Sequence, residues 1–489
     1  MSVNAKTNNI RYYLICFICF FLMFFGGAIP SFSPLIPKVG MQIICLFVGM
    51  VGMWTFIGGV WPSILAIVAL GMTEYTTISG AIASSLGGPA TWQILFAFLL
   101  TSAITLSGAG EYISRWALSK KFWKGKPYRF SLAYLLILSL ISALGNAVAS
   151  LLLGWAILSS IAVTLESSVK HNYFKCMAVF IMPACVFGEM SIPFKGFMPA
   201  FWGTLCNTAG VQYNNIGYLI IAVILTIAVD ILLIISMKLL KVDISILINY
   251  DNASINEKFK NTPLTDQQKF SLITMLCCLV LAMLPSLLPS TSTLAAILNK
   301  LSASGIFAIG TVALLLIKRK NGTQFFDIVE LTAKSPIWNP LFLAAAAVPI
   351  ATAIASSDVG FTAWVASVMS PIISNCSIIT FYSIVILISV ILTNFASNVG
   401  ITMMMLSIVI PMCPLVGASP YMTGIAIIIS ASCGYLLPSS SGVSAMAYGV
   451  KDSQGLETKD IFKYGLTLLG LYTIIAIIIF PILDKLIVV

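Results

Sequence analysis

Four short polar breaks interrupt long apolar segments of the chain, and the first two each carry an asparagine. These two breaks are Gly145-Asn146-Ala147 and Ser397-Asn398-Val399. An Asn amide provides two hydrogen-bond donors and an acceptor, and a helix that starts after the break directs its N–H groups and positive dipole end to the same point. This combination suits a carboxylate ligand. The alternative, in which each Asn only caps a helix, is left open.

A third break, at residues 188–196, places ionisable side chains inside an apolar segment. Glu189 and Lys195 both lie here. Such residues at membrane depth are costly, and they usually face a cavity or pair with each other. We therefore expect Lys195, with the adjacent Gly196, to be a fixed cation near the substrate, and Glu189 and Ser191 to be charge-compensating or cation-binding residues. A structural Glu189–Lys195 pair, or a Lys195 that snorkels to one face, is the alternative.

The fourth break, at residues 434–444, is rich in hydroxyl groups. Pro438 is followed directly by Ser439, Ser440 and Ser441. Unpaired hydroxyl groups are unfavourable in lipid, but they are useful on the wall of a polar cavity. An external Ser-rich loop is excluded because apolar residues lie on both sides. We predict that these four residues line the substrate site.

The composition is that of a membrane protein. Of the 489 residues, 59% are hydrophobic and 9% are charged, whereas soluble proteins have about 25% charged residues. The eleven cysteines lie mostly inside apolar runs and are expected to be small core residues, and a single histidine argues against a histidine-based metal site. We expect no cofactor.

The apolar segments predict an all-α polytopic membrane protein with eleven transmembrane spans and two re-entrant helical hairpins. A span needs about 20 apolar residues, or fewer inside a bundle. The predicted spans are 12–30, 40–57, 59–73, 91–109, 174–207 with a break, 214–240, 268–287, 301–318, 338–356, 422–449 with a break, and 461–483. The hairpins are 130–164 and 377–412, because each has its break in the middle. Segments 111–126 and 358–371 are predicted to be short interfacial helices, with ordinary loops as the alternative.

The positions of the basic residues give the orientation. With the N-terminus in the cytoplasm and each hairpin making no net crossing, most of the 26 Lys and Arg residues fall on the cytoplasmic side, as the positive-inside rule requires. The net charge of +10 therefore reflects topology in a multi-pass cytoplasmic membrane protein. Nucleic acid is not an expected partner.

The polar loop 241–267 separates two halves that repeat the same order of features. Thr91-Trp92-Gln93-Ile94-Leu95-Phe96 is similar to Ile337-Trp338-Asn339-Pro340-Leu341-Phe342. Each is followed by a short segment that contains a Trp, then a broken hairpin, then a broken span. In the predicted topology the two Trp spans run in opposite directions. The halves are therefore predicted to be inverted repeats, which in transporters place a binding site near the bilayer midplane.

These features together resemble the divalent anion:sodium symporter family, whose bacterial members are INDY-like dicarboxylate transporters. The resemblance covers nearly the whole chain and includes residues 437–449, which are similar to the family's Pro- and Ser/Thr-rich stretch ending in Ala-x-x-x-Gly. It implies that Asn146 and Asn398 hold the carboxylates of a C4–C6 di- or tricarboxylate such as succinate, malate, 2-oxoglutarate or citrate. It also implies a homodimer with an elevator mechanism. The scaffold domain would comprise 1–127 and 241–373, the latter with the cytoplasmic loop, and the transport domain 128–240 and 374–489.

The chain departs from the family at the hairpin tips. Family members carry a Ser-Asn-Thr triplet there, whereas Ala147 and Val399 replace both Thr residues and Gly145 replaces the first Ser. Sodium is a candidate coupling ion, but these losses and Lys195 argue against it. We expect an anion exchanger, with a sodium-coupled symporter as the alternative. A membrane-embedded enzyme would need a base with an orienting partner, and only Glu189 could serve. A cation antiporter would need carboxylates at the breaks.

Overall fold

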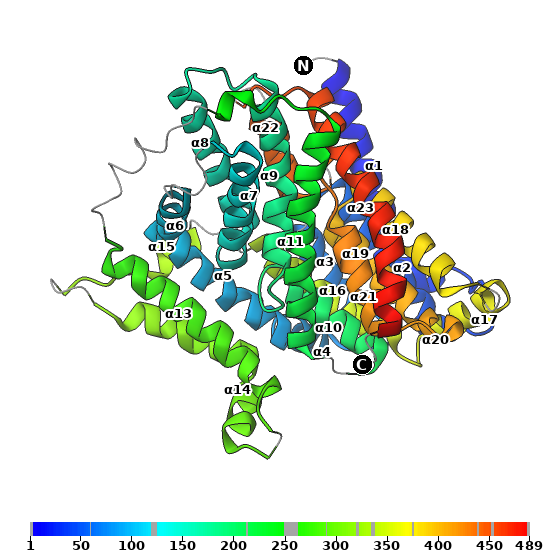
Figure 1. The fold of residues 1–489 in the computed structure, drawn as a ribbon. Coiled ribbons are helices and arrows are strands. Elements are labelled where there is room, and N and C mark those ends of the chain that lie inside the picture. Colours follow the sequence, from blue (N-terminus) through cyan, green and yellow to red (C-terminus); the bar gives the residue numbers. More distant parts are fainter. Residues whose placement is uncertain are drawn as a thin grey trace.

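The computed structural model is an assembly of helices, shown in Figure 1. It describes the chain except for residues 1–2, 59, 119–124, 212–213, 249–262, 290, 319–321, 334–337, 374–375, 438–439, 451–453 and 487–489. Within the described residues there is no strand, and the only β pairing is an isolated bridge between Lys318 and Gln324.

Helices form at every predicted span. The unbroken ones are α1 (Val3–Phe25), α2 (Lys38–Phe56), α3 (Val60–Gly71), α5 (Pro89–Ser107), α11 (Asn215–Leu239), α13 (Asp266–Met283), α14 (Thr293–Leu316), α16 (Trp338–Ala355) and α23 (Thr458–Leu486). Helix α14 is kinked at Ser302, where φ is +54°, so the predicted span 301–318 is the part after the kink. By length and composition, seven helices in the described structure could cross a membrane, and further apolar helices are shorter. The prediction of a polytopic helical protein is confirmed.

Both hairpins and both broken spans divide where the polar breaks predict. The first hairpin consists of α7 (Pro127–Leu144) and α8 (Ala147–Thr164), and the second of α18 (Ile378–Phe395) and α19 (Asn398–Val409). The broken spans are α9 (Asn172–Met190) with α10 (Met198–Ala209), and α21 (Pro420–Ala431) with α22 (Gly442–Val450). Proline at the first turn of α7 and α10 and a left-handed Gly210 after α10 mark these ends.

Shorter elements connect these helices. A helix overlaps each predicted interfacial segment, namely α6 (Ala109–Leu118) and α17 (Phe361–Ile373). Two short helices were not expected from the apolar pattern, α4 (Ile78–Ser85) and α15 (Ile328–Ala333), because their polar residues hide the periodicity. The remaining elements are α20 (Cys413–Val416) and the 3-10 turns at Gly26–Ala28, Ser245–Leu247, Leu284–Ser286 and Ile410–Met412.

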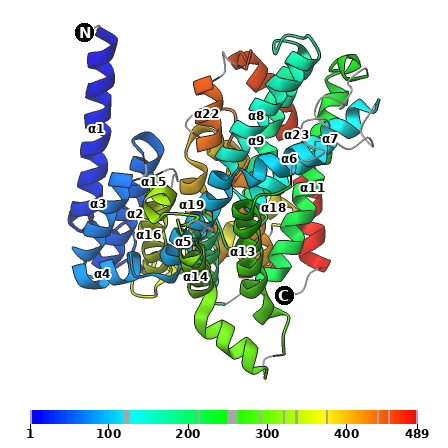
Figure 2. The ribbon, with the colours of Figure 1, turned by 90° about the vertical axis from the view of Figure 1, so that its left-hand side faces the viewer.

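The two halves pack in a reciprocal way. In the first half α5 packs against α13, α14 and α15 of the second, whereas α16 of the second half packs against α2, α3 and α4 of the first. Likewise α10 contacts α19 of the second hairpin and α22 contacts α8 of the first. Each half thus completes the other, as inverted repeats do. Figure 2 shows α1 to α4 on one side of the molecule and α11 and α23 on the other.

Close helix contacts hold the first hairpin to its broken span. A Cβ on Gly188 of α9 would lie 2.3 Å from the Ser139 carbonyl oxygen of α7, so only glycine permits this approach. The Ser139 hydroxyl lies 3.0 Å from the Ala184 carbonyl oxygen and 2.8 Å from Asp230 Oδ2 of α11. The Ser139 hydroxyl of α7 thus contacts both α9 and the buried Asp230 of α11.

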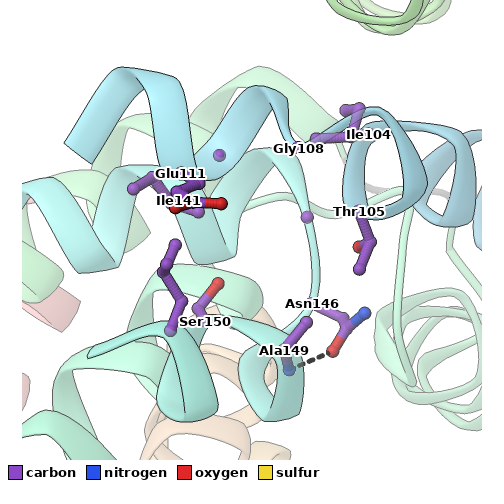
Figure 3. Close-up of a pocket in the computed structure, with 11 residues that line it drawn as sticks. Ile104, Thr105, Gly108, Glu111, Ile141, Asn146, Ala149 and Ser150 are labelled. Atoms are coloured by element: carbon purple, nitrogen blue, oxygen red, sulfur yellow. Dashed lines mark hydrogen bonds between the residues drawn. The ribbon is translucent and has the colours of Figure 1, made fainter. Parts of the chain in front are cut away.

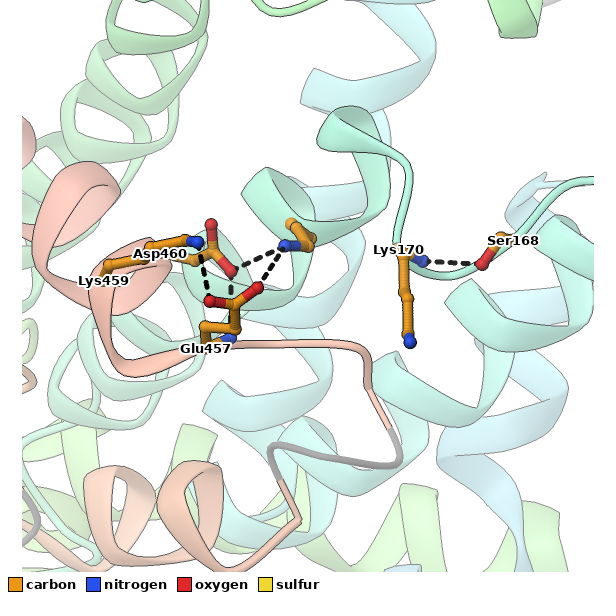
Figure 4. Close-up of polar contacts among 6 residues, drawn as sticks. Ser168, Lys170, Glu457, Lys459 and Asp460 are labelled. Atoms are coloured by element: carbon orange, nitrogen blue, oxygen red, sulfur yellow. Dashed lines mark hydrogen bonds and ion pairs between the residues drawn. The ribbon is translucent and has the colours of Figure 1, made fainter.

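An ion pair ties the two halves together where α9 and α23 begin (Figure 4). Lys175 Nζ lies 2.9 Å from Asp460 Oδ2, and the two side chains are only 12% and 10% exposed. Near the other end of α23, Asp484 accepts hydrogen bonds from the Tyr382 hydroxyl and the Ser419 N–H. The last helix is thus fastened near both of its ends. All eleven cysteines are free thiols and most are buried, as the sequence predicts.

Candidate functional site

The tip of the first hairpin is formed by Gly145 and Asn146. Asn146 is the N-cap of α8, and its Oδ1 accepts a hydrogen bond of 2.8 Å from the Ala149 N–H. The capping alternative is therefore true of Asn146. It uses only the oxygen of the amide, and the Nδ2 group has no hydrogen-bond partner within the described part of the chain. Asn146 thus keeps two N–H donors for a ligand while it starts the helix.

Lys195 lies behind this tip and is 1% exposed. Its ammonium donates hydrogen bonds to the carbonyl oxygens of Ser142 at 2.9 Å, Ala143 at 2.8 Å and Gly145. These carbonyls lie at the C-terminal end of α7, where the last turn lacks intrahelical donors and the dipole is negative. An ammonium has three donors, so Lys195 is fully occupied by the backbone and has none left for a substrate.

Glu189 interacts with the other arm of the hairpin. Its Oε2 accepts a hydrogen bond of 3.2 Å from the Ala147 N–H, at the positive N-terminal end of α8. Gly196 has φ +58°, and a Cβ there would lie 3.1 Å from Glu189 Oε1, so the glycine makes room for the carboxylate. Among the described contacts there is no direct ion pair between Glu189 and Lys195. Each charge is placed against the helix end of opposite polarity.

The hydroxyl of Ser191 is used at the end of α9. Its hydroxyl donates to the Gly188 carbonyl oxygen at 2.7 Å, and its N–H bonds to the end of α9. The structure therefore gives Ser191 a helix-ending contact, which Ser side chains commonly make with nearby backbone groups.

The second tip is organised differently. Ser397, not Asn398, is the N-cap of α19, and Asn398 is the first helical residue. The Asn398 N–H donates to the Ser440 carbonyl oxygen at 2.8 Å, which joins the tip to the fourth break. Val399 is buried, whereas Ser397 and Asn398 are half-buried.

Two serine hydroxyls of the fourth break form hydrogen bonds within the break. The Ser440 hydroxyl donates to the Leu437 carbonyl oxygen at 2.6 Å and the Ser441 hydroxyl to that of Gly434 at 2.9 Å. Buried Asn394 of α18 fastens the break, because its Oδ1 accepts from the N–H groups of Tyr435 and Leu436. Pro438 and Ser439 lie outside the described residues.

The predicted site residues therefore form two groups. The first comprises Gly145, Asn146, Ala147, Glu189, Lys195 and Gly196, and the second comprises Ser397, Asn398, Val399, Ser440 and Ser441. In the part of the chain that the structure describes, no hydrogen bond joins one group to the other.

A pocket of about 160 Å³ lies at the first tip (Figure 3). It is lined by Ile104, Thr105, Gly108, Gly110, Glu111, Ile141, Gly145, Asn146, Ala149, Ser150 and Leu153. Hairpin residues form one wall, and the end of α5 with the start of α6 forms the other. Of the predicted binding residues that the structure describes, only Gly145 and Asn146 line this pocket. The contribution of Thr105 and Glu111 could not be expected, since it depends on how α5 and α6 pack beside the hairpin.

The family model of the CitMHS citrate transporters matches residues 43–434, which is most of the chain and includes both hairpin tips. The chain belongs to the CitMHS citrate transporter family. Its relatives by family are transporters, so an enzyme acting on lipid-linked substrates is set aside.

Two further likenesses agree with this assignment. A transporter of Methanocaldococcus jannaschii, the uncharacterized MJ0672, is 26% identical over 190 residues, which are 39% of this chain and 40% of that one. The match thus spans well under half of that relative's length. The crystal structure of the Alcanivorax borkumensis YdaH transporter has the same fold, with a TM-score of 0.51 at 12% identity. The likeness covers 90% of this chain and 98% of that one.

In this CitMHS transporter the polar breaks lie at the ends of apolar helices. Buried polar groups in such positions must find partners within the protein, because lipid offers none. The first tip meets this demand with Lys195 and Glu189, and the second with the backbone of Ser440. Asn394 does the same for the fourth break. The first tip also borders a pocket, which makes it the better supported binding site.

Proposed function

We propose that this protein carries citrate and related C4–C6 di- and tricarboxylates, such as succinate, malate and 2-oxoglutarate, across the cytoplasmic membrane. The observation that carries this proposal is the Asn146 amide, which lines a pocket at the start of α8 with its nitrogen unpartnered among the described residues. Amide donors and a helix N-terminus together favour a carboxylate. Membership of a citrate transporter family supports this choice of substrate class.

Transport would follow an elevator mechanism. In this proposal residues 128–240 and 374–489 form the moving transport domain and residues 1–127 and 241–373 the scaffold, within a homodimer whose N-termini are cytoplasmic. The pocket would then lie at the border between the two domains, because α7 and α8 come from one and α5 and α6 from the other. Sliding of the hairpin along α5 and α6 would open or close it.

The protein would exchange one anion for another rather than depend on sodium. A coupling cation compensates the charge of the substrate and must leave before the empty carrier returns. The Lys195 ammonium already occupies three carbonyl oxygens behind the first tip, and it cannot leave. A sodium-coupled symporter is the alternative, because Glu189 could offset the lysine charge in the empty carrier.

Counterflow tests the substrate class. Purified protein is reconstituted into vesicles loaded with one of a panel of unlabelled di- and tricarboxylates, and the entry of labelled citrate is followed in sodium or in potassium medium. We expect citrate and its close analogues to drive accumulation in both media, and monocarboxylates to fail. If no carboxylate drives counterflow, the proposal is wrong.

A further inference from the structure

Ser150 of α8 is buried and lacks a partner. Its side chain is 1% exposed, and its hydroxyl makes no hydrogen bond in the described structure. Buried polar groups are nearly always hydrogen-bonded, so each exception requires an explanation. Several other buried atoms share this lack of a partner, namely in Ser85, Thr208, Asp230, Ser389, Tyr435 and Ser444. Of this set, only Ser150 lines the pocket at the first tip.

In the second hairpin, a hydroxyl at the same sequence spacing from the asparagine is satisfied within its own helix. Thr402 follows Asn398 by four residues, as Ser150 follows Asn146, and its hydroxyl donates to the Asn398 carbonyl oxygen at 2.7 Å. A serine in a helix can make the same bond to the carbonyl four residues earlier. Ser150 does not make it, although its N–H bonds normally to the Asn146 carbonyl oxygen at 3.0 Å.

The hydroxyl of Ser150 lies one helical turn from Asn146, on the same face of α8. Both residues line the pocket and are drawn together in Figure 3. A carboxylate placed there would find two kinds of donor from one rigid helix, the Asn146 amide and a hydroxyl group.

We propose that Ser150 is a substrate-binding residue, whose hydroxyl donates a hydrogen bond to the carboxylate that Asn146 also holds. This inference rests on the proposed function, and it assigns the carboxylate to the α8 face of the pocket. Thr402 has no such role, because its hydroxyl is already used by the helix.

The test compares Ser150→Ala with Thr402→Ala in the purified full-length protein. Citrate affinity is measured by labelled-ligand binding, and thermal stability is measured without ligand. We expect Ser150→Ala to weaken citrate binding about 10-fold or more, since hydrogen bonds to charged groups are the strong ones. Its melting temperature should stay unchanged or rise, because an unpartnered hydroxyl is removed. Thr402→Ala should instead keep the affinity and lose some stability.

Either of two results with Ser150→Ala overturns the inference, and citrate binding by the wild type tests the proposed function. Ser150→Ala with wild-type affinity, or with a loss of stability like that of Thr402→Ala, assigns the hydroxyl a structural role. If the wild type binds no member of the carboxylate panel, the proposed function itself fails. As a second readout, a small thiol reagent is applied to the Ser150→Cys variant. The labelling of the wild-type protein, which carries the eleven native cysteines, is subtracted. Citrate should protect the introduced thiol, and unprotected labelling in a citrate-binding preparation contradicts the inference.

Discussion

The ammonium of Lys195 lies against the carbonyl oxygen of Gly145, and thereby places a buried cation at the tip of the first hairpin. The same tip has a carboxylate on its other side, because Glu189 accepts the Ala147 N–H. Between them these two side chains hold the end of α7 and the start of α8. Residues of the third break thus stabilise the first break. The buried charges of Lys195 and Glu189 are each compensated by a helix end of opposite polarity, and not by an ion pair with each other.

Replacing Lys195 should therefore destabilise the hairpin. Lys195→Ala leaves three buried carbonyl groups without their ammonium donor, and a buried group left without its partner costs about 1–3 kcal/mol. The melting temperature in detergent should fall clearly, and citrate transport should be impaired. Lys300→Ala, at an exposed lysine, is the control and should change neither. A Lys195→Ala protein as stable as the wild type would contradict this reading.

Substitutions of Asn146 can separate helix capping from ligand binding. Asn146→Ala loses both functions, and the lost cap alone costs about 1 kcal/mol. Asn146→Asp keeps a capping oxygen but has no N–H donors and adds a negative charge to the pocket. We expect both variants to abolish citrate binding, with stability lost only in Asn146→Ala. Citrate titration and thermal unfolding measure the two effects, and wild-type affinity in either variant would argue against the site.

Asn398→Ala is expected to abolish citrate binding too, while the protein stays folded and the proposed dimer stays intact. The structure supports a small structural cost, because the Asn398 contact with Ser440 uses the backbone N–H and survives the substitution. Size-exclusion chromatography checks the assembly and ligand binding checks the site. Normal binding by Asn398→Ala would confine the substrate to the first tip.

The sequence could reveal the breaks because an amide, a proline or a run of serines inside an apolar segment has few structural explanations. The sequence could not reveal which residues of the two hairpin tips occupy equivalent positions. Sequence similarity pairs Asn146 with Asn398, whereas the helix caps pair Asn146 with Ser397. A shift of one residue in a helix start depends on local hydrogen bonds, which a pattern of residue types does not record.

The hydrogen-bond partners of the buried charged side chains also could not be predicted from the sequence. Lys195 contacts carbonyl groups about 50 residues earlier in the chain, and backbone acceptors carry no signal in the sequence. The pocket wall from α5 and α6 depends on tertiary packing in the same way. By contrast, Ser150 could have been noticed from its spacing to Asn146, although only the structure shows that its hydroxyl is unpartnered.

The orientation predicted from the basic residues can be tested by cysteine labelling. An impermeant thiol reagent applied to intact cells should label Lys300→Cys but not Lys258→Cys or Arg319→Cys, and the last two should react in inside-out vesicles. Residues 258 and 319 lie outside the described structure, whereas Lys300 lies in α14. Exposed Cys277 must first be replaced by serine. The opposite pattern would invert the topology and exchange the sides from which the hairpins enter.

The Lys175–Asp460 pair should contribute more to stability than a surface pair does. Its side chains are 12% and 10% exposed, and it joins α9 to α23. We expect a double-mutant cycle with Lys175→Ala and Asp460→Ala to give a coupling energy of about 1–3 kcal/mol. The matched control is Lys38–Glu74, whose side chains are 63% and 54% exposed and for which about 0–1 kcal/mol is expected. Equal coupling in the two cycles would refute a fastening role.

The preference for exchange over net uptake is expected from the charge that remains when the substrate leaves. With Lys195 held by α7, the empty site keeps an ammonium inside the membrane, and moving an uncompensated charge there costs several kcal/mol. Substrate from the opposite side removes this penalty, so loaded movement both ways is favoured. We therefore expect labelled citrate to enter vesicles that contain unlabelled citrate, in sodium or potassium alike, and hardly to enter empty ones. Glu189 offsets part of the lysine charge, so Glu189→Gln should reduce entry into empty vesicles further while exchange continues. Rapid entry into empty vesicles that needs a sodium gradient would instead show that sodium, and not Lys195, provides the mobile charge.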